Sequence, residues 1–233
     1  MGMAQRVCGP AVVLASALAV AGCGIIGTES RETKTYQVAD AVHTLDVQSG
    51  AGDVTVVESD RSGVAVTETL YWGGDRPTTE RPVSGGTLTL AYSCGGGLFG
   101  IKNCGVDYRV EIPRGMRLVK VGTGAGDVRL EGVGATLDIG AGAGDITAVR
   151  LVAGRTKAES GAGDVDLAFT DAPDQVEVET GAGDGTLRLP PGPYAVTLHT
   201  GAGSETVHID RDPNAPRKIS VQTGAGNVNL LKV

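Results

Sequence analysis

The sequence predicts an all-β protein, a right-handed single-stranded β-helix (β-solenoid) with coils of about 20 residues. Three observations support this fold. Only 3% of the 233 residues are aromatic whereas 37 are glycine. Apolar and polar residues alternate with the period of a half-buried strand, and the triplet Gly-Ala-Gly followed by a short polar residue occurs seven times. An antiparallel β-sandwich is the alternative fold, because two strands in every 20 residues or so also suit it.

The repeat sets the length of one structural unit. The triplets begin at Gly50, Gly124, Gly142, Gly161, Gly181, Gly201 and Gly224. From the second copy onward the steps are 18, 19, 20, 20 and 23 residues, which indicates a stack of similar units. Near-identical letters at matching positions favour stacking of like on like, and therefore the solenoid.

The alternation changes phase across each triplet. Around Gly124, for example, the apolar residues Val119 and Val121 stand at odd positions before it, whereas Val128 and Leu130 stand at even positions after it. A straight strand keeps its phase, so the chain must bend or bulge at the triplet. Glycine suits such a corner because it adopts positive φ without a Cβ clash.

The residue after each triplet distinguishes three interpretations: a structural corner, a calcium site and a phosphate loop. In chain order this residue is Asp53, Asp127, Asp145, Asp164, Asp184, Ser204 and Asn227. All three residue types can accept a hydrogen bond from a nearby backbone N–H in a turn, but they do not share the charge that a carboxylate-built calcium site needs. Dinucleotide and Walker motifs do not match. We therefore predict structural turn residues with no metal or cofactor, and keep a calcium-binding repeat as an alternative.

The amino terminus predicts an export signal. Arg6 precedes the apolar run "AVVLASALAVA" (11–21), which is too short to span a bilayer and suits a signal peptide over residues 1–22. The sequence "VAGC" (20–23) resembles the lipobox of bacterial lipoproteins. This resemblance implies that the mature protein begins at Cys23 and is anchored in a membrane by acyl chains on that residue. An ordinary secretory signal is the alternative.

Two further cysteines predict a disulfide. Cys8 leaves with the signal peptide, whereas Cys94 and Cys104 flank a glycine-rich loop. Two remaining cysteines in an exported chain are typical of a disulfide. Metal binding would need more ligands than two thiols.

The mature chain is predicted to contain a flexible tether at residues 23–35 and a single β-solenoid domain at 36–233, with an insertion and the disulfide loop at about 72–105. Asp53 lies 74 residues before Asp127, close to four more periods. We interpret the strand-like runs in this gap as degenerate coils. They cover residues 63–72, 86–92 and 106–113.

Four apolar or aromatic side chains stand beside the insertion and the cysteine loop. They are Tyr71, Trp72, Leu98 and Phe99. We expect them to cap one end of the solenoid and protect its edge; an exposed binding patch is the alternative.

Charge and residue types exclude several functions. Without Arg6, 19 basic and 27 acidic residues give the mature chain a net charge of −8, which disfavours nucleic acid as a partner. The histidines, His43, His199 and His208, are scattered over predicted strands. A nucleophile beside a base is therefore not indicated, and we predict no catalytic residues. Stacked corner aspartates in a polysaccharide-active β-helix enzyme are the alternative.

Several motifs together resemble a known family. A "DV" pair follows three of the five Gly-Asp corners, and "VDYRVEIPRG" after the cysteine loop leads into "VGTGAGDVRL". Over roughly residues 36–233 the chain is similar to bacterial domains of unknown function described as "putative adhesins". The resemblance implies a β-helix-like fold and a cell-envelope setting, and it supplies no active-site residues. We predict an exported, non-catalytic protein that is lipid-anchored to the bacterial cell membrane, faces outside the cytoplasm, and adheres to, binds or senses envelope polysaccharide or a surface protein.

Overall fold

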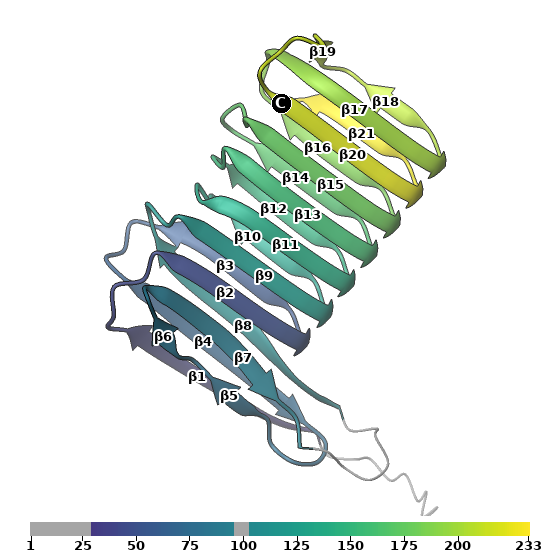
Figure 1. The fold of residues 1–233 in the computed structure, drawn as a ribbon. Coiled ribbons are helices and arrows are strands. Elements are labelled where there is room, and N and C mark those ends of the chain that lie inside the picture. Colours follow the sequence, from purple (N-terminus) through teal and green to yellow (C-terminus); the bar gives the residue numbers. More distant parts are fainter. Residues whose placement is uncertain (1–28, 96–102) are drawn as a thin grey trace, which may run out of the picture.

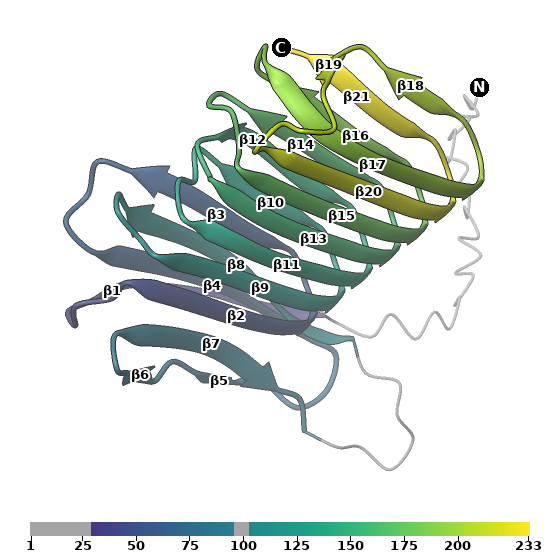
Figure 2. The same cartoon turned by 45° about the horizontal axis from the view of Figure 1, so that its top comes forward.

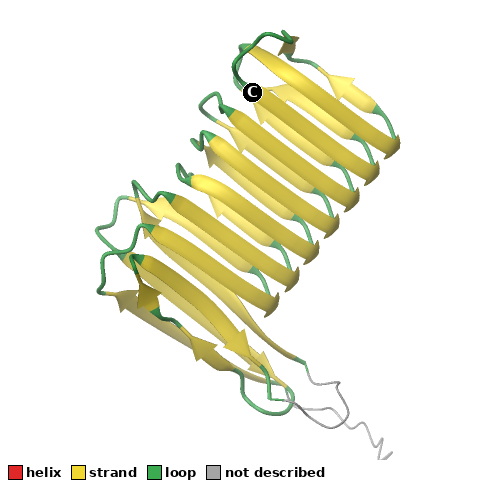
Figure 3. Cartoon of the chain, in the orientation of Figure 1, coloured by secondary structure: helices red, strands yellow, loops and turns green. Residues whose placement is uncertain are grey.

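A computed structural model describes residues 29–95 and 103–233. The predicted signal peptide and Cys23 lie outside the described residues. The described chain is all-β (Figure 3). Its coils stack on one another, and their strands form two long, mostly parallel sheets (Figure 1). The predicted β-solenoid is confirmed and the antiparallel sandwich is wrong. Within the same residues there is no helix with the length and apolar character needed to cross a membrane.

The strands of the described chain fall into two sheets, which we call sheet 1 and sheet 2. In spatial order, sheet 1 consists of β1 (Ser30–Val38), β4 (Val64–Trp72), β8 (Cys104–Pro113), β3 (Val54–Ser59), β10 (Val128–Glu131), β12 (Ile146–Leu151), β14 (Val165–Phe169), β16 (Gly185–Leu189), β21 (Val228–Lys232) and β18 (Glu205–Val207). Sheet 2 consists of β19 (Asp210–Arg211), β17 (Pro193–Ala202), β20 (Lys218–Ala225), β15 (Gln175–Ala182), β13 (Arg155–Ala162), β11 (Thr136–Ala143), β9 (Leu118–Ala125), β2 (Thr44–Ala51), β7 (Thr87–Ser93) and β5 (Thr78–Glu80), with β6 (Val83–Ser84) paired to β7.

Each regular coil places one strand in each sheet, with the glycine corner between them. In the coil β11–β12, Leu137 and Ile139 precede the corner, Ile146 and Ala148 follow it, and all four are at most 1% exposed. The phase change predicted from the sequence is therefore confirmed. It lets both strands direct their apolar side chains into one dry interior, whose burial drives the folding of the stack.

The two glycines of each triplet serve different needs. A Cβ on the first glycine of this coil, Gly142, would lie 2.5 Å from the carbonyl oxygen of Gly124 in the neighbouring coil. The second glycine, Gly144, has φ +147°, a conformation that L-residues rarely adopt. The triplet therefore permits both the close approach of the coils and the sharp turn.

The first part of the chain corrects one prediction. The coil β2–β3 stacks directly on β9–β10, with Leu45 opposite Val119, so the segment between Asp53 and Asp127 does not lie between their coils. Only β7 and β8 form a degenerate coil, parallel to β2 and β3. In contrast, β4 is antiparallel to both β8 and β1, and β1 is the edge strand at this end of sheet 1 (Figure 2). The alternation of apolar and polar residues shows which side chains of a strand are buried but not the direction of the strand. For this reason sequence reasoning missed the antiparallel strands β4 and β1.

The predicted tether is too long, because residues 30–35 belong to β1. Polar cross-strand pairs hold this edge strand to β4: the hydroxyls of Thr35 and Thr67 are 3.0 Å apart, and those of Thr33 and Thr69 are 3.3 Å apart. An edge strand held in this way lacks the apolar alternation that marks the interior strands.

The disulfide between Cys94 and Cys104 is confirmed, with an S–S distance of 2.05 Å. It joins the residue after β7 to the first residue of β8, at the place where the regular coils have a glycine corner. Trp72 packs against the hydrophobic core at the same end, as the capping interpretation expects. Leu98 and Phe99 lie outside the described residues.

The opposite end departs from chain order. The last coil, β20–β21, lies between β15–β16 and β17–β18 (Figures 1 and 2). The coil β17–β18 carries Glu205 where the other regular coils have Val, Ile or Gly, and this carboxylate is exposed. Because an unpaired buried charge is very costly, β17–β18 occupies the open end of the stack.

Candidate functional site: the corner row and the polar groove

The seven predicted turn residues come together in one line along the edge of the solenoid, which we call the corner row. Each side chain except that of Ser204, which ends the row, accepts a hydrogen bond from the next coil rather than from its own turn. The N–H of Asp145 donates to Oδ1 of Asp127 at 2.9 Å, and the N–H of Asp164 donates to Oδ1 of Asp145 at 2.8 Å. The sequence predicts that these side chains accept a backbone N–H of their own turn. In the structure they accept the N–H of the equivalent residue in the next coil, because stacking brings equivalent residues close together.

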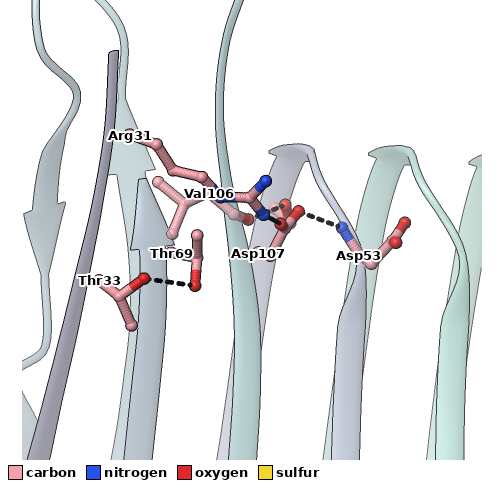
Figure 4. A network of polar contacts seen from close by, with 7 residues as sticks. Arg31, Thr33, Asp53, Thr69, Val106 and Asp107 are labelled. Atoms are coloured by element: carbon pink, nitrogen blue, oxygen red, sulfur yellow. Dashed lines mark hydrogen bonds and ion pairs between the residues drawn. The ribbon is translucent and has the colours of Figure 1, made fainter. Parts of the chain in front are cut away.

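The corner row extends beyond Asp53 at one end and finishes at Ser204 at the other. At the first end, Asp107 of β8 accepts the N–H of Asp53 at 3.1 Å and pairs with Arg31 at 3.3 Å (Figure 4). At the other end, the N–H and Oγ of Ser204 donate to Oδ1 of Asn227 at 3.1 and 2.8 Å.

Sequence reasoning missed Asp107 because no triplet precedes it. The available signal was the order Asp-apolar-Arg-apolar, which residues 107–110 share with residues 127–130. The register pairs Tyr108 and Val128 with the same residue of β3, Val54.

Asp and Asn link the coils of the corner row as hydrogen-bond acceptors, and Ser204 ends the row as a donor. Beside the row lies a small acidic hollow of about 270 Å³ near Asp145, Asp164 and Asp184. Asp166 at this hollow forms an ion pair with Arg188. Among the described residues, no group of three or more His, Cys, Asp or Glu side chains is placed to hold a metal ion.

A larger groove of about 710 Å³ crosses five coils on the outer face of sheet 2. Its floor contains the first glycines of the triplets and therefore has few side chains. Four polar side chains from adjacent strands line it, one from each of β13, β15, β20 and β17. In spatial order they are Glu159, Glu179, Gln222 and His199.

The polar lining differs in charge along the groove. Nζ of Lys157 lies 2.6 Å from Oε1 of Glu159, and this hydrogen bond, followed by the carboxylate charge, raises the pKa of Lys157. Within the described chain, the side chains of Glu179, Gln222 and His199 form no hydrogen bond with another residue. The predicted strand position of His199 is confirmed, and its exposed ring faces solvent. The groove thus offers free donors and acceptors at the strand spacing of about 4.8 Å.

A buried polar cluster lies under the closed end of the stack. The carboxylate of Glu68 is fully buried, and its Oε1 accepts the hydroxyl of Tyr36 at 2.7 Å. Within the described chain, Oε2 of Glu68 and the hydroxyl of Tyr108 have no hydrogen-bond partner. Burial, assisted by the charge of Glu68, raises the pKa of both tyrosines above the ordinary range. Sequence reasoning did not identify this cluster.

The fold and these sites define a class of protein: a two-sheet β-solenoid with a repeated glycine corner and a polar groove on one face. The chain belongs to the toastrack DUF4097 family, whose profile matches residues 44–231. A comparison with curated proteins finds no match.

Two solved structures show the same fold. A "putative cell adhesion protein" from Clostridium sporogenes is 14% identical with a TM-score of 0.53, and the match covers 88% of this chain and 100% of that one. A "putative adhesin" from Bacteroides fragilis is 14% identical with a TM-score of 0.50, and the match covers 90% of this chain and 100% of that one. At this level of identity the likeness is one of fold.

Proposed function

We propose that this protein is a non-catalytic, lipid-anchored binding module of the cell envelope, which holds an envelope polysaccharide or a surface protein in the groove of sheet 2. The groove carries this proposal. It crosses five coils without interruption, and the hydrogen-bonded stack beneath it keeps its polar groups at fixed spacing. A site of this kind binds an extended ligand without the cost of ordering its backbone.

The proposed location rests on two features. The disulfide between Cys94 and Cys104 is typical of a chain that matures outside the reducing cytoplasm. The lipobox-like "VAGC" ending at Cys23 supplies the anchor. Mass spectrometry of the mature protein should find an acylated Cys23 at the amino terminus, and Cys23→Ser should release the protein from the membrane fraction.

Binding can be tested with two matched triple variants. The groove variant is Glu179→Ala, Gln222→Ala and His199→Ala, which lie on β15, β20 and β17. The control carries alanine at three outward polar positions of sheet 1 in the same coils. These positions are Thr186, Asn229 and Thr206.

Each protein is titrated with purified envelope polysaccharide and, separately, with solubilised surface protein. We expect the groove variant to lose at least about tenfold in affinity, or about 1.4 kcal/mol, and the control to bind like the unmodified protein. Equal binding by all three proteins would refute the assignment of the groove.

A further inference from the structure

The C-terminal coil fills a slot between two coils that precede it in the chain. Its strand β20 is parallel to β15 on one side and to β17 on the other, and β21 lies in the same way between β16 and β18. The final segment of the chain therefore completes the interior of the stack rather than its end.

Side-chain chemistry, not chain order, selects the coil that fills this slot. The inward residues of β20–β21 are Ile219, Val221, Val228 and Leu230, all at most 1% exposed. Opposite Val228, the neighbouring coil has Glu205. If β17–β18 stacked next to β15–β16 in chain order, a further coil would bury this carboxylate.

The contacts of the C-terminal coil are of a kind that another chain could supply. Both sides of the coil are bound through parallel strand ladders and the corner row, in which the N–H of Asn227 donates to Oδ1 of Asp184 at 2.7 Å. Its covalent link to β19 is the short segment 212–217. That segment folds on itself, since the N–H groups of Asn214 and Ala215 both donate to Asp212, to Oδ1 at 2.9 Å and to the carbonyl oxygen at 3.0 Å.

We propose that two copies of this chain exchange their C-terminal coils, so that each slot is filled by β20–β21 of the other copy. A second copy is the occupant because it carries a coil that matches the slot in its apolar residues, its corner Asn227 and its strand register. Reciprocal exchange closes the pair and leaves neither slot open. The only new conformation is in segment 212–217, which opens to pass between the copies.

Concentration decides between the closed monomer and the exchanged dimer. The link through 212–217 gives the coil an effective concentration in the millimolar range for its own slot, so dilute chains close on themselves. Crowding of copies on a membrane surface favours exchange, and this step alone rests on the proposed lipid anchor. An exchanged dimer would also present two grooves and raise avidity for a repeated ligand.

Cross-linking between two different chains tests the exchange. In a Cys8→Ser, Cys23→Ser background, one chain carries Glu179→Cys and the other Gln222→Cys, which are exposed positions opposite each other in β15 and β20. Adjacent strands lie within the Cα separation that a disulfide spans. The chains are mixed unfolded and refolded together in a glutathione buffer at rising concentration. We expect a covalent heterodimer whose yield rises with chain concentration.

Two controls make a negative result informative. A mixture of Glu159→Cys and Glu179→Cys chains tests random cross-linking, because these opposite residues of β13 and β15 stay in one body during exchange. A single chain with both Glu179→Cys and Gln222→Cys should close an internal disulfide when dilute. If it does, and the test mixture forms no more heterodimer than the control mixture, the coil remains in its own chain. If the internal disulfide does not form, β20 does not lie beside β15, and the proposed exchange is refuted as well. Because cross-linking requires no ligand, this result is independent of the proposed groove function.

Discussion

Gly144→Ala should destabilise the stack strongly, because it perturbs both functions of the corner. At φ +147° an alanine pays about 1–3 kcal/mol of backbone strain. Its Cβ would also lie 2.7 Å from the carbonyl carbon of Gly126, and closer still to the oxygen. Relief of this overlap requires this coil to separate from the coil of Gly126, which weakens the hydrogen bonds from the Gly126 N–H to the Ala143 carbonyl oxygen (3.1 Å) and from the Asp145 N–H to Asp127 (2.9 Å). Two such bonds contribute about 1 kcal/mol each, so we expect a loss of about 3–5 kcal/mol.

The matched control is Gly140→Ala in the same strand, β11. A Cβ at Gly140 would meet no other atom within 4 Å, and its φ lies outside the left-handed region. This change should leave stability within about 1 kcal/mol of the unmodified protein, on the stabilising side, because alanine restricts the unfolded chain. Urea unfolding of the three proteins measures both differences. A loss below about 1 kcal/mol for Gly144→Ala, or equal losses for the two variants, would refute the steric account of the corner.

Four further predictions follow from the described contacts. Asp145→Asn should change the free energy of unfolding by less than about 0.5 kcal/mol, because the amide oxygen still accepts the next coil's N–H, whereas Asp145→Ala should cost about 1–2 kcal/mol. A chelator should leave the melting temperature unchanged within about 2 °C, since about 1 kcal/mol of lost binding would already shift it by that much. Breaking the disulfide with Cys94→Ser and Cys104→Ser should cost about 2–3 kcal/mol in chemical denaturation. Stability should fall as the pH rises from about 10 towards 12, because burial raises the pKa of Tyr108 and, followed by the charge of Asp107, raises the pKa of Tyr71 to about 12. Folding favours the neutral phenols, so their contribution is complete below pH 10 or so and is lost as unfolded tyrosines ionise.

Each of these predictions has a result that would contradict it. Equal losses for the two Asp145 variants would show that the charge, rather than the accepted hydrogen bond, matters in the corner row. A drop of more than a few degrees with chelator would favour the calcium-binding alternative. Unchanged denaturation after loss of the disulfide would show that strand pairing alone holds the β7–β8 junction. An alkaline transition in Tyr108→Phe as steep as in the unmodified protein would assign the loss of stability to other groups.

Local chemistry made the regular coil readable from the sequence. Alternation at Val119 and Val121, its change of phase at Gly124, and the short polar residue at Asp127 all act within a few bonds of one corner. These features recur in each copy, so the strands, the corner and the buried face follow without tertiary information. The disulfide was equally accessible, because Cys94 and Cys104 are close in the chain. The same local signals exist in the final coils, where Glu205 at an inward position already marks a strand that cannot be buried.

Only the tertiary structure decided what depends on neighbours distant in the chain. It placed the last coil between the two coils that precede it in the chain, turned β4 antiparallel, brought Asp107 into the corner row, and buried Glu68 beside two tyrosines. It also assembled the groove, whose polar side chains come from four strands of separate coils. The physical reason is that alternation specifies which face of a strand is buried but neither the direction nor the identity of the strand beside it. The direction and identity of the neighbouring strand depend on which of several similar coils packs best at each position of the stack.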